Sequence, residues 1–175
     1  MAKHTKARRS VVVEPWAIDE IQVAGFKSIN DEQRIEIRPL TILAGANSSG
    51  KSSMMQPVLL LKQTLEASYD PGTLLLNGPN VKFTSADQLL SRIGKGHSLD
   101  SFHVGMRANT GESFQSRFRK EHKMGFEIEQ MEISEKSGTY ALWPEMSHGQ
   151  IVKTGITTGK SLSESTPAEY GEGRW

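Results

Sequence analysis

Residues 40–53 read LTILAGANSSGKSS, and this stretch decides the fold that the sequence predicts. Residues 40–44 form a mostly apolar run typical of a buried strand. The leucine-rich stretch at residues 52–67 is long enough for a helix of about four turns. A buried strand, a glycine-rich loop and a helix in this order predict an α/β fold: a P-loop NTPase core whose mixed sheet surrounds residues 40–44.

The loop between the expected strand and helix has a composition suited to binding phosphate. It fits G-x-x-x-x-G-K-[ST] without a mismatch, so we expect a nucleotide site that holds ATP with Mg²⁺. Backbone N–H groups would converge on the phosphates, Lys51 would bridge the β- and γ-phosphates, and the Ser52 hydroxyl would ligate Mg²⁺. The alternative is a Gly/Ser turn that matches by chance. The expected binding residues are Gly45, Ala46, Asn47, Ser48, Ser49, Gly50, Lys51, Ser52 and Ser53.

Composition excludes several other classes of protein. The chain has 175 residues and no cysteine, which rules out disulfides, thiol catalysis and cysteine zinc sites and fits a reducing cytoplasm. The longest apolar stretch of any expected helix, residues 58–61, is far too short to span a membrane. The net charge is +1, but four basic residues lie in the first nine, so the remainder is slightly acidic and does not indicate a basic nucleic-acid module.

The chain divides into four expected segments. Residues 1–15 form a basic tail, expected to be disordered or, alternatively, to touch nucleic acid. Residues 16–95 form the nucleotide-binding lobe, 96–153 a β-rich segment, and 154–175 a flexible polar tail. A hairpin is expected around Asn77-Gly78 and a short helix at 86–93. Strands are expected at 18–26, 34–37, 102–106, 113–118, 125–133, 140–143 and 150–153.

Other motifs expected of a complete ATPase are missing. Residues 155–161 resemble a second phosphate loop but have three residues between the glycines instead of four. Asp19 follows a short apolar run, yet it precedes the loop and is expected to be an exposed residue at a strand start. No apolar run followed by Asp-Glu occurs after Lys51, and residues 162–165 only begin like an ABC signature motif. The five histidines are scattered and do not indicate a zinc site.

Three stretches together resemble one family. VAGFKSI at residues 23–29, LTIL at 40–43 and GANSSGKSS at 45–53 resemble the N-terminal half of an ABC-type ATPase head. The nearest groups are the SMC, RecF and OLD-nuclease relatives, often labelled "AAA family ATPase" in bacteria. The resemblance covers residues 18–92, and the GFKS opening makes it more specific than the loop alone.

The resemblance implies further site residues and partners. Lys27 or Ser28 would approach the phosphates. Gln88, with Gln63 as second candidate, would sense Mg²⁺ and the γ-phosphate, although either could be an ordinary solvated glutamine on a helix face. Such heads carry an antiparallel β-subdomain and dimerise around ATP, so a homodimer or a complementing C-terminal ATPase half is implied. The full-length form would act with DNA or an effector nuclease, in DNA repair or anti-phage defence.

The chain departs from the family because its signature and Walker B motifs are missing. It is therefore interpreted as a fragment, a truncated frame or one piece of a split ATPase, with weak Mg-ATP binding and little hydrolysis. One alternative is a small P-loop kinase or transferase, but Arg107, Arg117 and Arg119 lie in a strand-like region without a lid helix. Another is a non-catalytic interaction fragment.

Overall fold

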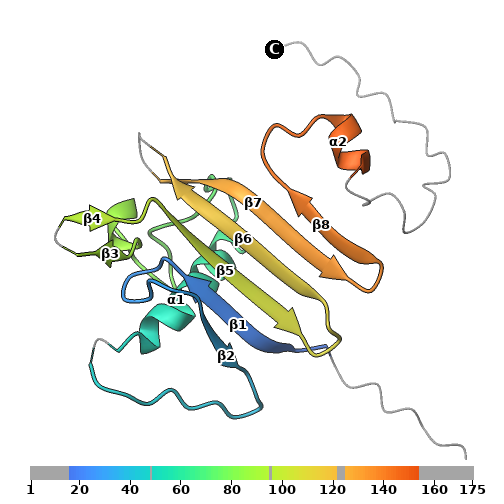
Figure 1. The fold of residues 1–175 in the computed structure, drawn as a ribbon. Coiled ribbons are helices and arrows are strands. Elements are labelled where there is room, and N and C mark those ends of the chain that lie inside the picture. The colour runs from blue at the N-terminus through green and yellow to red at the C-terminus, as the bar shows by residue number, and fades with distance from the viewer. Residues whose placement is uncertain (1–15, 48, 95, 122–124, 154–175) are drawn as a thin grey trace, which may run out of the picture.

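A six-stranded antiparallel sheet runs through most of the described chain (Figure 1). The structure is a computed structural model that describes residues 16–47, 49–94, 96–121 and 125–153. The strand order is β2-β1-β5-β6-β7-β8, and every neighbouring pair is antiparallel. The strands are β1 (Ile18–Ala24), β2 (Gln33–Glu36), β5 (Ser101–Ala108), β6 (Ser113–Lys120), β7 (Phe126–Glu135) and β8 (Gly138–Leu142).

Alternation of apolar and polar residues gives this sheet an inner and an outer face. Along β5, Phe102 and Val104 are buried, whereas His103 and Arg107 point to the other side. The register pairs Phe102 with Phe118 and His103 with Arg117, so each strand continues the face of its neighbour. The inner face is therefore apolar and forms the core, and the outer face is polar.

The remaining elements are short. Helix α1 (Lys51–Leu65) contacts β1 and lies behind the sheet in the view of Figure 1. It contains Pro57, which is buried. The other elements are the 3₁₀ turn η1 (Ala86–Gln88), the two-stranded pair β3 (Arg92–Ile93) and β4 (His97–Ser98), and α2 (His148–Lys153).

Aromatic rings form the centre of the core. The Phe102 ring lies 5.1–5.3 Å, centroid to centroid, from the rings of Phe26, Phe118 and Phe126. Phe26 also meets Phe83 edge to face at 6.2 Å. These contacts join β5, β6 and β7 to the turn after β1 and to the segment between α1 and η1.

The expected α/β fold with a P-loop NTPase core is wrong. The described residues form mainly antiparallel sheet with two α-helices, and they contain no parallel strand pair. Residues 40–44, expected as the central buried strand, form no strand, and Leu40 and Ile42 are 79% and 77% exposed. A parallel partner needs a long crossover connection. After α1, however, β5 to β8 follow one another through short connections, which pair them antiparallel.

Two smaller elements also differ from expectation. Residues 86–93 form only η1 and then β3, and not one helix, because Leu89, Leu90 and Ser91 are all buried against the core and the turn after β1. Residues 150–153 belong to α2 and not to a strand. The strands expected near 18–26, 34–37, 102–106, 113–118, 125–133 and 140–143 are confirmed within a few residues.

The two expected tails, residues 1–15 and 154–175, lie outside the described residues, as do the second loop-like motif and residues 162–165. β1 of the expected nucleotide-binding lobe pairs with β5 of the expected β-rich segment, so one sheet contains strands of both. Within the part of the chain that the structure describes, no helix is long and apolar enough to cross a membrane.

Gln63 holds the segment between α1 and η1 against the helix. Its side chain is 1% exposed, and its amide nitrogen donates to the carbonyls of Leu75 and Val81. Its Oε1 accepts from the backbone N–H groups of Asn80 and Val81, at 3.1 and 2.9 Å. A Cβ on Gly78 would lie 2.5 Å from this side chain, so the hairpin at Asn77-Gly78 needs glycine to approach it. Gln63 is thus a structural residue of the core.

Replacing Gln63 by leucine should lower the free energy of unfolding by about 2–4 kcal/mol, because both backbone groups of buried Val81 and the part-buried groups of Leu75 and Asn80 lose this side-chain partner. Urea unfolding followed by circular dichroism measures this loss. Gln88→Leu is the matched control, since the Gln88 side chain is exposed and, among the described residues, bonds only to Thr84; it should cost less than about 1 kcal/mol. Equal losses in the two variants would contradict the structural role of Gln63.

Candidate functional site

The first turn of α1 offers unpaired backbone donors. Gly50 precedes the helix in a left-handed conformation, with φ 94°, which glycine adopts without strain. No side chain caps the helix, and its first turn contains no acidic residue. The N–H groups at this end therefore point toward the loop with the positive end of the helix dipole, an arrangement that favours an anion.

The loop before α1 curls around the ammonium group of Lys51. Its Nζ donates to the carbonyl oxygens of Gly45 and Ala46, at 2.7 and 2.6 Å. A Cβ on Gly45 would lie 2.8 Å from Ser49 Oγ, so the loop closes this tightly only with glycine there. A bound phosphate would replace the two carbonyls as the partner of Lys51. Ser48 lies outside the described residues.

A tight turn after β1 brings Lys27 and Ser28 to the same place. Phe26 and Ile29 bridge across it, and Lys27 at its tip has φ 52°. The buried Ser91 hydroxyl contacts the carbonyl oxygens of Lys27 and Ile29, at 2.9 and 2.7 Å. The Lys27 N–H donates to the carbonyl of Leu89, at 2.7 Å. The turn is thereby fixed from the side of the core.

The turn and the start of α1 enclose a cavity of about 430 Å³, which we call the loop cavity. This is within the range of about 300–1,000 Å³ usual for ligand sites. Ser28 Oγ lies 3.1 Å from Ser53 Oγ, which joins the two walls. Among the described residues the lining contains two lysines and no carboxylate, so it favours a polyanion. The lining residues are Lys27, Ser28, Asn47, Gly50, Lys51, Ser52 and Ser53.

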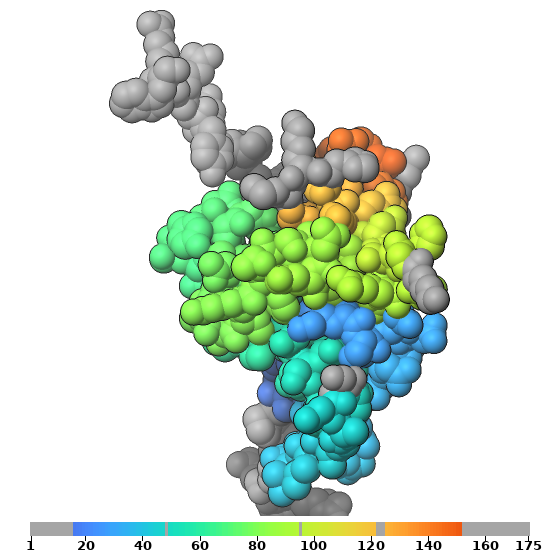
Figure 2. All heavy atoms as spheres, turned by 90° about the vertical axis from the view of Figure 1, so that its left-hand side faces the viewer, coloured from blue at the N-terminus to red at the C-terminus, as the bar shows by residue number. Residues whose placement is uncertain are grey.

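The other residues predicted from the motif lie near this cavity without lining it. Gly45, Ala46 and Ser49 are exposed loop residues that support Lys51. Figure 2 shows the loop and the segment before it projecting at the bottom of the molecule. The loop approaches the turn closely, because a Cβ on Gly50 would lie 3.3 Å from Ser28 Oγ.

The described lining of the loop cavity offers too few ligands to bind a magnesium ion without a bound phosphate compound. Ser52 is exposed on the cavity wall and offers a hydroxyl oxygen, the type of ligand that Mg²⁺ prefers. Among the described residues, no group of three or more His, Asp or Glu could hold a metal ion. Ser52 would therefore share the ion with phosphate oxygens and water.

The structure does not bring the two candidate glutamines to the loop cavity. Gln88 is exposed in η1, where its amide bonds the backbone and hydroxyl of Thr84 at 2.9 Å. Gln63 is buried in the core as described above. Gln56 instead approaches the site, since its Oε1 accepts from Lys27 Nζ at 3.1 Å. The sequence signal for Gln56 was its position four residues after Ser52, on the same face of the helix.

Lys27 is further positioned by an aromatic ring. Its Nζ lies 5.2 Å from the centre of the Phe83 ring, within the range of a cation–π contact. Arg107, Arg117 and Arg119, the residues considered for a kinase lid, lie on β5 and β6 and do not line the loop cavity. Asp19 lies in β1 and pairs with Arg107 at 3.1 Å, on the surface.

Comparisons with protein-family models, with curated proteins and with solved structures give no match to this chain.

Gly25→Ala should displace the turn that carries Lys27 and Ser28. Gly25 has φ 73°, and a Cβ there would lie 2.5 Å from the backbone oxygen of Ser101. Strained φ and the close contact together should cost about 2–4 kcal/mol of unfolding free energy. Gly72→Ala is the control, because Gly72 has φ 74° and nothing within 4 Å; it should cost only about 1–2 kcal/mol. Urea denaturation of both variants checks this, and a smaller loss for Gly25→Ala would refute the close approach.

Proposed function

We propose that this chain binds Mg-ATP in the loop cavity, as the ATP-binding part of an ABC-type ATPase. The observation that carries the proposal is the meeting of two separate sequence motifs in one cavity. Lys27 and Ser28 come from the GFKS motif, and Gly50 to Ser53 come from the glycine-rich loop more than twenty residues later. Two motifs this far apart in the sequence have no general reason to lie side by side, so their meeting in one cavity supports a common function.

Charge and hydrogen-bond donors support a nucleotide triphosphate over a neutral ligand. Lys51 and Lys27 both line the cavity, and the first residues of α1 line it as well, so the positive end of the helix dipole lies beside it. In this arrangement Lys51 bonds the terminal phosphates, Ser52 holds Mg²⁺ with them, and Lys27 neutralises remaining charge. Gln56 and Phe83 keep Lys27 in place.

The proposal includes little hydrolysis by this chain alone. Phosphoryl transfer to water needs a group that positions the attacking water and charges that stabilise the transition state. No Asp or Glu is among the described residues that line the loop cavity. We propose that a second copy or a complementing C-terminal ATPase half supplies these groups, and that the assembly acts with DNA or an effector nuclease.

Exposed apolar residues beside the loop support such a partner. Leu40 and Ile42 are more than three-quarters exposed, although burying a side chain of this size is worth about 1.5–3 kcal/mol. They precede the loop directly, so a chain that covers them would lie next to the bound nucleotide. Such a partner would be detected by oligomerisation of this chain, or by faster ATP hydrolysis when the complementing half is added.

Calorimetry of the purified chain with Mg-ATP tests the binding proposal. We expect a dissociation constant in the micromolar range that is lost in Lys51→Ala. Lys62→Ala is the matched control, because Lys62 lies in the last turn of the same helix and pairs with Glu66; it should bind as the unchanged chain does. A folded chain that binds no nucleotide would overturn the proposal.

Phosphate release under saturating Mg-ATP tests the second part. The unchanged chain should release phosphate no faster than Lys51→Ala, because no carboxylate of the described lining can orient water. Turnover several-fold above that variant, in the absence of any partner, would show that this chain carries its own catalytic group.

A further inference from the structure

The outer face of the sheet carries an arginine without a partner. Three arginines near it are engaged with carboxylates: Arg34 with Glu32, Arg107 with Asp19, and Arg119 with Glu129. Arg117 lies on β6 two residues before Arg119. Among the described residues, its guanidinium forms no ion pair and no side-chain hydrogen bond, so its charge is available to a ligand.

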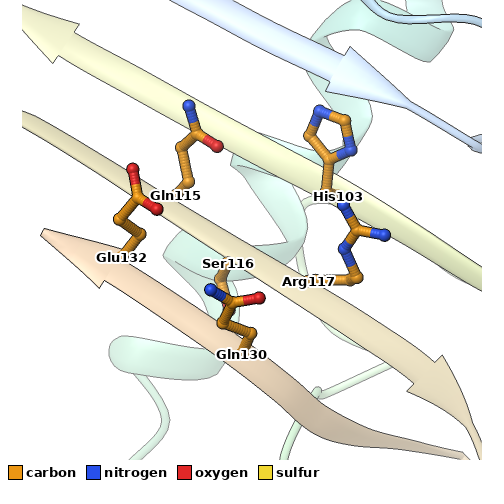
Figure 3. Close-up of a pocket in the computed structure, with 6 residues that line it drawn as sticks. All are labelled: His103, Gln115, Ser116, Arg117, Gln130 and Glu132. Carbon is orange, nitrogen blue, oxygen red and sulfur yellow. The ribbon is translucent and has the colours of Figure 1, made fainter. Parts of the chain in front are cut away.

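His103 lies next to Arg117 and is also incompletely paired. The two residues face each other in the register of β5 and β6, and Figure 3 shows their side chains side by side. The Nε2 atom of His103 is buried and lacks a directed hydrogen bond, although it lies 3.3 Å from a Glu32 carboxylate oxygen. Glu32 is therefore a charge partner of this atom, and only a well-directed hydrogen bond is missing among the described residues.

Two cavities share these two side chains, and they differ in charge. The cavity of about 110 Å³ drawn in Figure 3 also includes Glu132, which would repel an anion. The other, of about 190 Å³, lies where β1 ends and β5 begins, and we call it the strand-end cavity. Its lining adds Asn30 and Ser101 and, among the described residues, contains no Asp or Glu.

We propose that the strand-end cavity binds a phosphate-type oxyanion, held by Arg117 and His103. Arg117 supplies the positive charge and paired N–H donors that match two oxygens of a phosphate. Asn30 and Ser101 add neutral donors, which satisfy the remaining oxygens. The volume is several times the roughly 30 Å³ that one water takes in the liquid, so a five-atom ion fits.

The protonation state of His103 leaves Arg117 as the main positive charge of the site. Burial, followed by the neighbouring Arg117 charge, holds the pKa of His103 below its usual value, although Glu32 opposes this. The imidazole is therefore mostly neutral at pH 7. Glu32 repels the ligand less than a free carboxylate would, because Arg34 bonds it and lowers the pKa of Glu32.

The strand-end cavity is separate from the loop cavity, so its test is independent of nucleotide binding. The full chain, labelled with ¹⁵N, is titrated with inorganic phosphate at constant ionic strength, and the imidazole signals are followed by NMR. His103→Gln identifies the signals of His103 among the five histidines. We expect these signals to shift and to saturate at millimolar phosphate, in Lys51→Ala as in the unchanged chain.

Two arginine variants decide whether the site is specific. Arg117→Gln should remove the phosphate-dependent shift of His103. Arg119→Gln, the same change on the same strand and face, should retain it because Arg119 is already neutralised by Glu129. Signals of His103 that do not move with phosphate, or an equal loss in both variants, would overturn the proposal.

A further arm identifies the source of the oxyanion. A short single-stranded oligonucleotide, titrated in the same way, presents the same chemistry as a phosphodiester. The oligonucleotide concentration is expressed per phosphodiester. If the oligonucleotide shifts the His103 signals at a much lower concentration than inorganic phosphate does, and Arg117→Gln removes this shift, the site holds a nucleic-acid phosphate. If only inorganic phosphate acts, the site holds a free phosphate or a small phosphorylated ligand. Either result supports oxyanion binding.

Discussion

The burial of one aromatic ring fixes the arrangement on which the candidate site depends. Phe26 is fully buried and packs against Phe83 on one side and Phe102 on the other. Its neighbours in the chain, Lys27 and Ser28, are thereby held at the surface, opposite the start of α1. A hydrophobic contact in the core thus sets the position of two polar groups, with Ser91 securing the backbone of the same turn.

The same turn separates the two cavities proposed as binding sites. Its tip lines the loop cavity, whereas its two ends, at Gly25 and Asn30, line the strand-end cavity. The backbone of Gly25 donates to the carbonyl of Asn30 at 3.1 Å, which closes the turn. The segment is anchored through the Phe26 ring, the Ser91 hydroxyl and the bond from the Lys27 N–H to the Leu89 carbonyl, so its tip and its two ends are held by the same part of the core.

Local patterns in the sequence were enough to predict part of this structure. The antiparallel strands near 18–26 and 102–133 were predictable because alternating residues have to divide between a core and a solvent face. The contacts of Lys51, Lys27 and Ser28 with phosphate stay a prediction from the motifs; the structure places these three residues around one cavity. The failure at residues 40–44 has a physical cause: an apolar run shows that burial would be favourable, but a strand also needs a neighbouring strand, which local sequence does not reveal. The helix period places Gln56 on the face of Ser52, but the sequence does not reveal its partner Lys27, 29 residues away, or the partners of Gln63 in the segment after α1.

Pro57 weakens the connection between the first turn of α1, which follows the loop, and the rest of the helix. It has no N–H to donate to the carbonyl of Ser53, so the first turn is joined to the rest of the helix by one hydrogen bond fewer. Beyond it, Leu60 and Gln63 are each 1% exposed and hold the second half of the helix in the core. Met54 anchors the first turn in the core as well, although this turn has one hydrogen bond fewer to the rest of the helix. The orientation of the turn that carries Lys51 therefore depends on the packing of Met54 as well as on the hydrogen bonds of the helix.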